Sequence, residues 1–263
     1  MLCKTMNTPT LDQIRWHRSI RQYTDDPVDK NLVETVVAAA QRSSTSSNLQ
    51  MYSVVAVTDV ALKERLAQLC GEQQHIVQAP VFLAWCADLS RLDRICQLRG
   101  YEHVSEYVEN FLLSAVDTAI LMQTAALAAE SLGLGLCFIG AIRNSPQRVI
   151  ELLKLPRLVF PISGMTLGWA AAEPALKPRL PLEAVLHWEG YDCSLEGEVL
   201  NAYDKTMAKT AVYKGRQVAS TTPGAQQKEE GAYGWLEHTA RRVSTPKRTG
   251  LRQTLVDQGF NLR

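Results

Sequence analysis

Four short segments of this sequence concentrate hydroxyls, fixed cations and exposed backbone amides. They read "HRSIR" at residues 17–21, "SSTSSNLQ" at 43–50, "FIGAIRN" at 138–144 and "LKPRL" at 176–180. Such donors suit a phosphate joined to a planar heterocycle that is rich in carbonyl and imino acceptors. One interpretation is therefore a site for a phosphorylated cofactor. The other is a set of surface ion pairs, each worth about 0–1 kcal/mol.

Each segment contributes a different kind of group. Pro178 stiffens the backbone of "LKPRL", so its two cations can be presented with little entropy left to lose. The expected donors are the cations Arg18, Arg21, Lys177 and Arg179, the hydroxyls of Ser19 and residues 43–47, and the amides of Gly140 and Ala141.

Hydrophobic periodicity predicts the elements that hold these segments. Amphipathic spacing predicts a helix through residues 32–40 capped by Asp29, and another over 60–70 capped by Asp59. Further helices are expected over 103–132 and 145–155, and strands over 51–58, 80–87, 135–140 and 159–169. This alternation predicts an α+β domain whose helices cover a central sheet. Residues 111–129 are too apolar for one sheet face to cover, so we expect a dimer interface there.

Several catalytic and cofactor motifs fail on inspection. "GLGLCFIG" has Phe138 where a dinucleotide fingerprint needs its third glycine, and it follows a helix and opens a strand. The sequence has no P-loop, HExxH, GxSxG or cysteine–histidine metal spacing. The serine run at 43–48 is not paired with a base, so it is expected to donate hydrogen bonds.

Composition indicates a soluble cytoplasmic protein. The net charge of +1 predicts no general affinity for nucleic acid or membranes. The six cysteines include several in apolar stretches, which is typical of a reducing compartment. The N-terminus lacks an apolar signal core. Asp117 and Gln123 interrupt the apolar stretch 111–129, so a buried helix is expected rather than a membrane span.

The C-terminal quarter differs in charge from the rest. Residues 201–263 hold 11 Lys/Arg against 5 Asp/Glu, whereas residues 1–200 hold 17 against 22. We therefore expect a core over residues 1–200 and a basic extension over 201–263, with a polar linker at 221–231. The extension is either a solvated arm or a site for an anionic ligand.

The sequence also resembles the nitroreductase family of FMN-dependent oxidoreductases, especially its oxygen-insensitive NADPH nitroreductases and NADPH–flavin oxidoreductases. The stretches that match, in order, are "HRSIRQYTDDPV", "RSSTSSNLQ", "GEQQHIVQAP", "AAESLGLGLCFIGAIRN", "LLKLP" and "LGWAAAEPALKPRLPLEAVLH". The resemblance covers residues 10–190 closely and the remainder loosely. It implies an α+β homodimer with a mostly antiparallel sheet, a long interface helix and FMN bound between the subunits.

The resemblance also implies roles for individual residues. All of them bind the cofactor and none is a catalytic acid or base, because the flavin N5 atom performs the chemistry. The "HRSIR" residues are expected at the phosphate and the pyrimidine side of the ring, with the serine loop at the ribityl chain and phosphate. The expected FMN-binding residues are His17, Arg18, Ser19, Arg21, Ser44, Thr45, Ser46, Gln50, Gln73, Ile139, Gly140, Ala141, Lys177 and Arg179.

Reductant and acceptor follow from the same resemblance. Candidates for the 2′-phosphate of NADPH are Lys214, Arg216, Arg241 and Arg242, and NADPH is expected over NADH. Asn48 is expected to face the acceptor pocket, where relatives can carry an aromatic residue. The implied activity is a ping-pong, two-electron reduction of nitroaromatics, quinones or related small molecules. The alternatives are a flavin reductase that supplies reduced FMN and a flavin-binding module without turnover.

Overall fold

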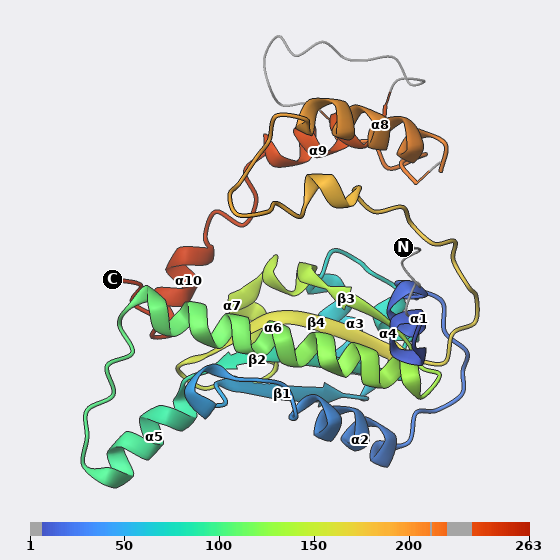
Figure 1. Cartoon of the computed structure of the whole chain (residues 1–263). Helices are drawn as coiled ribbons and strands as arrows, with labels where there is room; N and C mark the ends of the chain where they lie inside the picture. The colour runs from blue at the N-terminus through green and yellow to red at the C-terminus, as the bar shows by residue number, and fades with distance from the viewer. Residues whose placement is uncertain (1–6, 211, 220–232) are drawn as a thin grey trace. The chain divides into compact units, whose positions relative to one another are not determined.

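The computed structural model describes residues 7–210, 212–219 and 233–263 of the chain (Figure 1). Its contacts divide it into two compact units, a larger one of Met1–Ala175 with Gly250–Arg263 and a smaller one of Leu176–Thr249. Residue 200, the expected end of the core, falls inside helix α8 (Glu196–Ala208). The expected linker at 221–231 and Cys3 lie outside the described residues.

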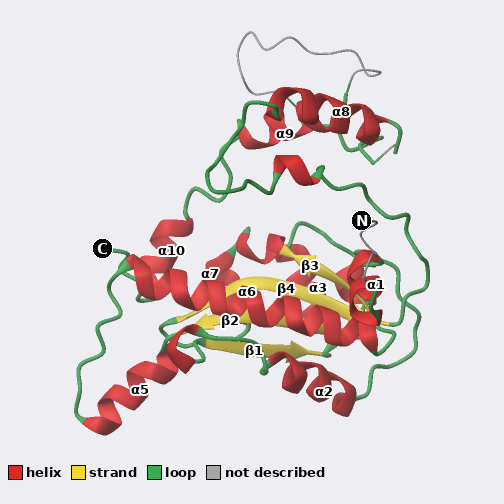
Figure 2. Ribbon diagram, in the orientation of Figure 1, coloured by secondary structure: helices red, strands yellow, loops and turns green. Residues whose placement is uncertain are grey.

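An antiparallel sheet of four strands forms the centre of the larger unit, in the order β1-β2-β4-β3 (Figure 2). All residues of β2 and most of β4 are buried, which explains why both strands read as continuous apolar runs. The four expected strands and the α+β class are confirmed. The strands are β1 Tyr52–Val57, β2 Val81–Asp88, β3 Gly135–Ile139 and β4 Val159–Gly168.

Helices cover both faces of this sheet (Figure 1). On one face, α2 (Lys30–Ala40) and α6 (Val108–Ser131) pack Val36 and Leu121 against the strands. On the other face, α3 (Val60–Leu69), α4 (His75–Gln78) and α7 (Pro146–Leu152) form a second core. The remaining helices are α1 Pro9–Arg15, α5 Ser90–Arg99, α9 Trp235–Val243 and α10 Leu251–Asp257, with short 3₁₀ turns at Ser46–Asn48, Gly140–Arg143 and Leu182–Ala184.

Two predicted helix starts are confirmed in atomic detail. The carboxylate of Asp29 accepts from the Asn31 amide, and that of Asp59 accepts from the Leu62 amide. The expected start of the long helix at residue 103 is wrong, because α6 begins at Val108. The Val108 amide donates to the Arg263 carbonyl, and the Arg263 amide donates to the Glu106 carbonyl. The returning C-terminus thus takes the backbone bonds that an earlier helical turn would need.

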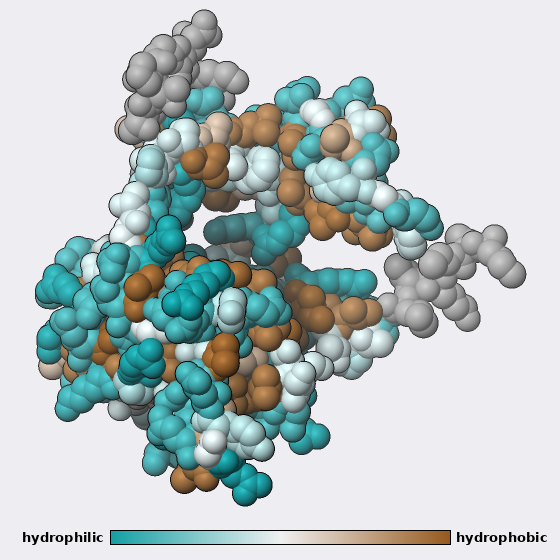
Figure 3. Space-filling model, turned by 90° about the vertical axis from the view of Figure 1, so that its left-hand side faces the viewer, coloured by the Kyte–Doolittle hydropathy of each residue, from teal (hydrophilic) through white to brown (hydrophobic). Residues whose placement is uncertain are grey.

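Helix α6 has one buried face and one exposed apolar face. It meets the length and hydropathy of a membrane span, but it carries the buried Asp117 and packs on the sheet as a core helix. On its outer side, Leu112, Val116 and Ile120 are 54%, 45% and 42% exposed. Their spacing of four residues places them in one stripe. Apolar patches also reach the surface on the face of the protein drawn in Figure 3.

Candidate functional site

The segment of residues 17–23, here called the N-terminal arm, is fixed along the edge of β3. The Ile20 amide donates to the Leu136 carbonyl over 2.8 Å. Ile20 is only 6% exposed and lies on Gly135, where a Cβ atom would come within 2.7 Å of its side chain. The Tyr23 hydroxyl donates to the Ile20 carbonyl over 2.8 Å and contacts the Thr166 hydroxyl. The inward Ile20 thereby aligns the polar residues on either side of it.

Two carboxylates engage the first residues of the arm. His17 Nδ1 lies 2.6 Å from Glu130 Oε1 at the end of α6, so the histidine side chain does not cap helix α1. Arg18 Nη1 lies 2.7 Å from Glu173 Oε2, and the guanidinium of Arg18 lies over the Trp16 ring. Arg18 and both glutamates line a pocket of about 420 Å³. Within the described residues, Arg18 Nε and Glu130 Oε2 are buried without a hydrogen-bond partner.

The remaining expected flavin-ring residues lie around the same edge of the larger unit. Arg21 is exposed and close enough to His75 to lower the pKa of that imidazole, although burial is the larger cause. Gln73 lies between α3 and α4 rather than on a helix surface, and its amide donates to the Cys70 carbonyl over 2.6 Å. A Cβ atom at Gly140 would meet nothing closer than Arg143, 3.7 Å away, so a ligand has room at its backbone.

The serine loop, residues 43–50, is held by a different part of the fold. The Ser46 amide donates to Asp117 Oδ1 on α6 over 3.0 Å. Ser47, Asn48 and Gln50 all adopt positive φ angles of 48°, 56° and 52°. Such angles are costly for residues other than glycine and persist where the surrounding structure fixes them.

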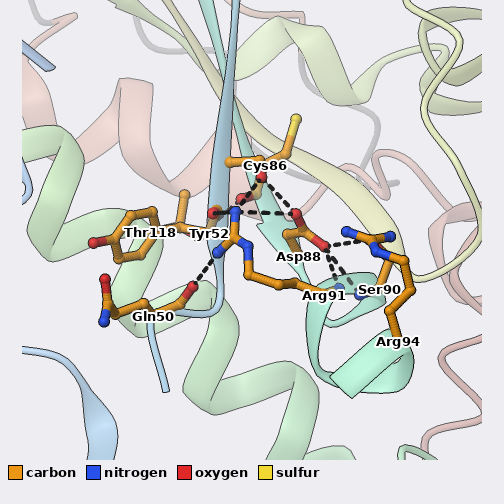
Figure 4. A network of polar contacts seen from close by, with 9 residues as sticks. Gln50, Tyr52, Cys86, Asp88, Ser90, Arg91, Arg94 and Thr118 are labelled. Carbon is orange, nitrogen blue, oxygen red and sulfur yellow. Dashed lines mark hydrogen bonds and ion pairs between the residues drawn. The ribbon is translucent and has the colours of Figure 1, made fainter. Parts of the chain in front are cut away.

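A network of charged and polar side chains fixes the C-terminal end of this loop (Figure 4). Arg91 Nη1 donates to the Gln50 carbonyl over 2.7 Å, and Nη2 donates to the Tyr52 carbonyl. Asp88, 4% exposed, lies 3.8 Å from Arg91. Burial raises the pKa of Asp88, but hydrogen bonds from Ser53 and Ser90 and the charge of Arg91 outweigh burial and lower it. Asp88 and Arg91 therefore anchor the C-terminal end of the serine loop.

The arm and the serine loop contact α6 at different levels. The arm contacts the helix at Glu130, whereas the loop contacts it at Thr124 through the Ser43 hydroxyl and at Asp117 through the Ser46 amide. A helix rises 1.5 Å per residue, so the Ser43 contact lies about 9 Å and the Ser46 contact about 20 Å from the arm contact along α6. The Ser46 end of the loop is therefore well separated along α6 from the arm of the same chain.

The "LKPRL" cations belong to the smaller unit. Arg179 Nη1 donates to the Lys177 carbonyl over 3.1 Å, and the Tyr203 hydroxyl of α8 donates to the Pro178 carbonyl over 3.1 Å. Lys177 and Arg179 are both exposed. The segment is thus attached to α8 through its central proline, with its two basic residues at the surface.

The four candidate NADPH residues differ in accessibility. Lys214 and Arg216 are exposed on a tight turn, and Arg242 is exposed on α9. Arg241 is instead paired with Glu237 over 2.7 Å, and its side chain is only 11% exposed. Arg241 is therefore committed to contacts within its own unit.

Sequence reasoning missed the residues that hold the candidate FMN-binding residues in place. Glu130, Asp88 and Arg91 lie on other elements than the residues they contact, so no local pattern reveals the pairing. The one available signal was the change from the apolar run of β2 to the polar "DLSR" at residues 88–91, where Asp88 ends β2 and Ser90 begins α5.

Comparison with known proteins gives a consistent result. The nitroreductase family matches residues 14–169, and the C-terminal domain of that family matches residues 177–263. The chain belongs to the nitroreductase family. The oxygen-insensitive NADPH nitroreductase of Salmonella typhimurium is 40% identical over 256 residues, covering 97% of this chain and all of the relative.

Two further nitroreductase relatives cover nearly the whole chain. An FMN reductase [NAD(P)H] of Bacillus subtilis is 44% identical, covering 94% of this chain and 95% of its own. The solved structure of the NADPH:FMN oxidoreductase of Vibrio harveyi, complexed with NAD+, superposes with a TM-score of 0.84 at 33% identity. That match covers 97% of this chain and all of the other. Both units of this protein therefore belong to the nitroreductase fold.

Proposed function

We propose that this nitroreductase is an FMN-dependent NAD(P)H oxidoreductase that reduces nitroaromatics, quinones or related small molecules by two electrons. The family match, together with relatives named as NADPH nitroreductase and FMN reductase, supports this function. The main structural support is the N-terminal arm, because its cationic donors are fixed at one edge of the sheet. We place the protein in the cytoplasm.

The residues present suit FMN. Arg18 Nε is buried without a partner among the described residues, in a pocket lined by Ile20 and Gly135. His17, Arg18, Ser19 and Arg21 are proposed for the phosphate and the pyrimidine side of the ring. Lys177 and Arg179 are proposed to complete that binding, one near the phosphate and the other near the ring. Gln73, Ile139, Gly140 and Ala141 are proposed along the ring, and Ser44, Thr45, Ser46 and Gln50 at the ribityl chain and phosphate.

Bound FMN would supply the hydride and electron chemistry. The chain's own contribution is electrostatic. Fixed cations such as Arg21 favour negative charge on the pyrimidine side, and an amide at Gly140 offers a preorganised donor. Burial, with a smaller contribution from Arg21, lowers the pKa of His75 and so disfavours a further positive charge near Arg21. No side chain is assigned as a general acid or base.

We propose a homodimer in which each FMN site combines two chains. The Ser46 contact of the serine loop lies about 20 Å from the arm contact along α6, yet both segments are assigned to the FMN phosphate. A two-fold axis that reverses the direction of α6 brings the loop of one chain beside the arm of the other. The exposed stripe of Leu112, Val116 and Ile120 gives this pairing an apolar surface to bury.

We assign NADPH recognition to the exposed basic residues of the smaller unit. Lys214 and Arg216, with Arg242 in the last turn of α9, are proposed to bind the 2′-phosphate. Asn48 is proposed to line the acceptor pocket.

A second candidate activity is an NADPH-dependent flavin reductase. The Bacillus subtilis relative named FMN reductase favours it, because it is 44% identical. Steady-state rates with a nitroaromatic, a quinone and free FMN distinguish the two activities. The higher kcat/KM identifies the acceptor class.

The basic test is spectroscopic. The purified protein should be yellow, and anaerobic NADPH should bleach its flavin absorbance. A colourless protein that takes up no FMN contradicts the whole proposal. A yellow protein that NADPH does not bleach indicates a flavin-binding module.

Complementation tests the composite site. Arg18→Ala removes a phosphate cation of the arm, and Gln50→Ala removes a side chain of the serine loop. Each variant alone should lose FMN from both sites. A mixed dimer of the two variants has one site with both changes and one intact site, so it should retain about half the flavin of the wild type. Mixed dimers with no more flavin than the single variants would show that both segments belong to the same chain's site.

A further inference from the structure

Residues 213–218, here called the basic turn, have a defined shape in the smaller unit. The Arg216 amide donates to the Tyr213 carbonyl over 3.0 Å, and Gly215 has a φ of +69°. A glycine at that angle closes the turn without the strain of a side chain. Lys214 and Arg216 leave the turn as exposed side chains. The two cations therefore start from a fixed backbone.

Two side chains hold the last residue of this turn. The Val218 amide donates to the Tyr233 hydroxyl over 2.9 Å. The carbonyl of the same residue accepts from Arg241 Nη1 over 3.0 Å. Arg241 also lies over the Tyr233 ring, with its guanidinium carbon 5.1 Å from the ring centroid. Both backbone groups of Val218 are thus bonded to one tyrosine–arginine pair.

The other end of the basic turn is held by an aromatic stack. The ring of His238, on α9, stacks on Tyr213 with centroids 4.4 Å apart and planes at 24°. His238 Nδ1 also lies 3.1 Å from the Tyr233 hydroxyl. The same three side chains, Tyr233, His238 and Arg241, therefore contact the turn at its first residue and at its last.

Arg241 does not suit the role of a phosphate ligand. Its Nε atom donates to Glu237 and its Nη1 atom to the Val218 carbonyl, and only 11% of its side chain is exposed. A guanidinium that is so engaged and so little exposed has few N–H groups left to offer a phosphate. Of the two α9 arginines expected at the nucleotide, Arg242 therefore remains available to bind the 2′-phosphate. Arg241 instead contacts the basic turn.

We propose that Tyr233, His238 and Arg241 are positioning residues that hold the basic turn in the conformation that reads the 2′-phosphate of NADPH. This inference rests on the proposed function, because it assumes that Lys214 and Arg216 meet that phosphate. Flexible cationic side chains lose less conformational entropy on binding when their backbone is already ordered. Removing a positioning contact should therefore weaken recognition of the 2′-phosphate while all its charges remain.

The test is calorimetric binding of two probes to the FMN-loaded protein. Adenosine 2′,5′-bisphosphate carries the 2′-phosphate, and 5′-AMP lacks it. Tyr233→Phe removes a single oxygen atom that accepts the Val218 amide. We expect this variant to bind the bisphosphate about fivefold more weakly, as the loss of one hydrogen bond does, and to bind 5′-AMP with unchanged affinity. Tyr191→Phe is the matched control, because Tyr191 is 79% exposed in the same unit.

A second variant separates positioning from direct contact. Arg216→Ala removes a side chain that is proposed to contact the 2′-phosphate. It should therefore reduce both the bisphosphate affinity and the dependence of that affinity on salt. Tyr233→Phe keeps every charge, so the salt dependence should stay as in the wild type. Arg241→Met should lose about as much bisphosphate affinity as Tyr233→Phe. If Arg241→Met does not fold, Tyr233→Phe alone decides the test.

Two results for Tyr233→Phe would overturn the inference, and one result for the wild type, given below, would also do so. One is a Tyr233→Phe protein that binds the bisphosphate as tightly as the wild type. The other is an equal loss for both probes, which would indicate general damage to the smaller unit. Failure of the proposed function is seen separately, as a wild-type flavin that NADPH does not bleach. A wild type that NADPH bleaches but that binds both probes alike overturns only the role of the basic turn.

Discussion

Gly135→Ala tests whether the N-terminal arm owes its position to one missing side chain. The new Cβ atom would lie 2.7 Å and 2.9 Å from Cγ1 and Cβ of Ile20, and 3.0 Å from its Cγ2. Carbon atoms in contact prefer about 3.5–4.0 Å. The arm must therefore move by about 1 Å, which stretches the bond from the Ile20 amide to the Leu136 carbonyl.

The expected size of the effect follows from overpacking. Inserting a methyl group into a packed site costs about 1–3 kcal/mol. A loss of about 2 kcal/mol lowers the melting temperature by about 4–8 °C at this chain length. Because the arm carries Arg18 and Arg21, we also expect FMN to bind at least about tenfold more weakly, which equals 1.4 kcal/mol.

The assay compares thermal unfolding of the apoprotein and FMN affinity measured by flavin fluorescence. Gly250→Ala is the control, because a Cβ atom there meets nothing within 4 Å. The double variant Gly135→Ala with Ile20→Ala removes both Cγ atoms that the new methyl group meets. We expect its loss of stability to be smaller than the sum of the single losses by about 1 kcal/mol.

The double variant also gives the result that would refute this reasoning. Strictly additive losses would mean that Gly135 and Ile20 do not compete for the same space. An unchanged melting temperature and FMN affinity for Gly135→Ala would show that the arm is not fixed at this contact.

Three other substitutions test neighbouring parts of the site. Tyr23→Phe leaves the buried Ile20 carbonyl without its hydroxyl donor, so it should lower the free energy of unfolding by about 1–3 kcal/mol in urea titrations, against no change for the exposed Tyr101→Phe. Asp88 has a pKa below its usual value, so it stabilises the fold above about pH 4. The stability difference between the wild type and Asp88→Asn should persist at pH 7 and shrink as the pH falls through the folded-state pKa, and a constant difference would contradict this. Arg179→Ala should weaken FMN retention about 10- to 100-fold, measured by equilibrium dialysis, and unchanged retention would remove Arg179 from the site.

Local rules predicted most of the secondary structure. The caps at Asp29 and Asp59 act within one helical turn, and the apolar runs of β2 and β4 follow from burial on both faces. The start of α6 could not be predicted in this way. It depends on backbone bonds with Arg263, which is more than a hundred residues away in sequence.

The sequence by itself determined the chemical types at the site and the family. Arginines, serines and a strand-end glycine stand in a fixed order along the chain, and such side-chain chemistry does not depend on the fold. Ile20 stands out in the same way, because it is the one aliphatic side chain of the arm, and the structure places it inward.

Only the tertiary structure decided which of these groups can act together. It placed the arm at the C-terminal end of α6 and the Ser46 amide near the middle of that helix, and it committed Arg241 to Glu237 and Val218. The physical reason is that hydrogen bonds and ion pairs act over a few ångströms in space, whereas sequence order records only neighbours along the chain.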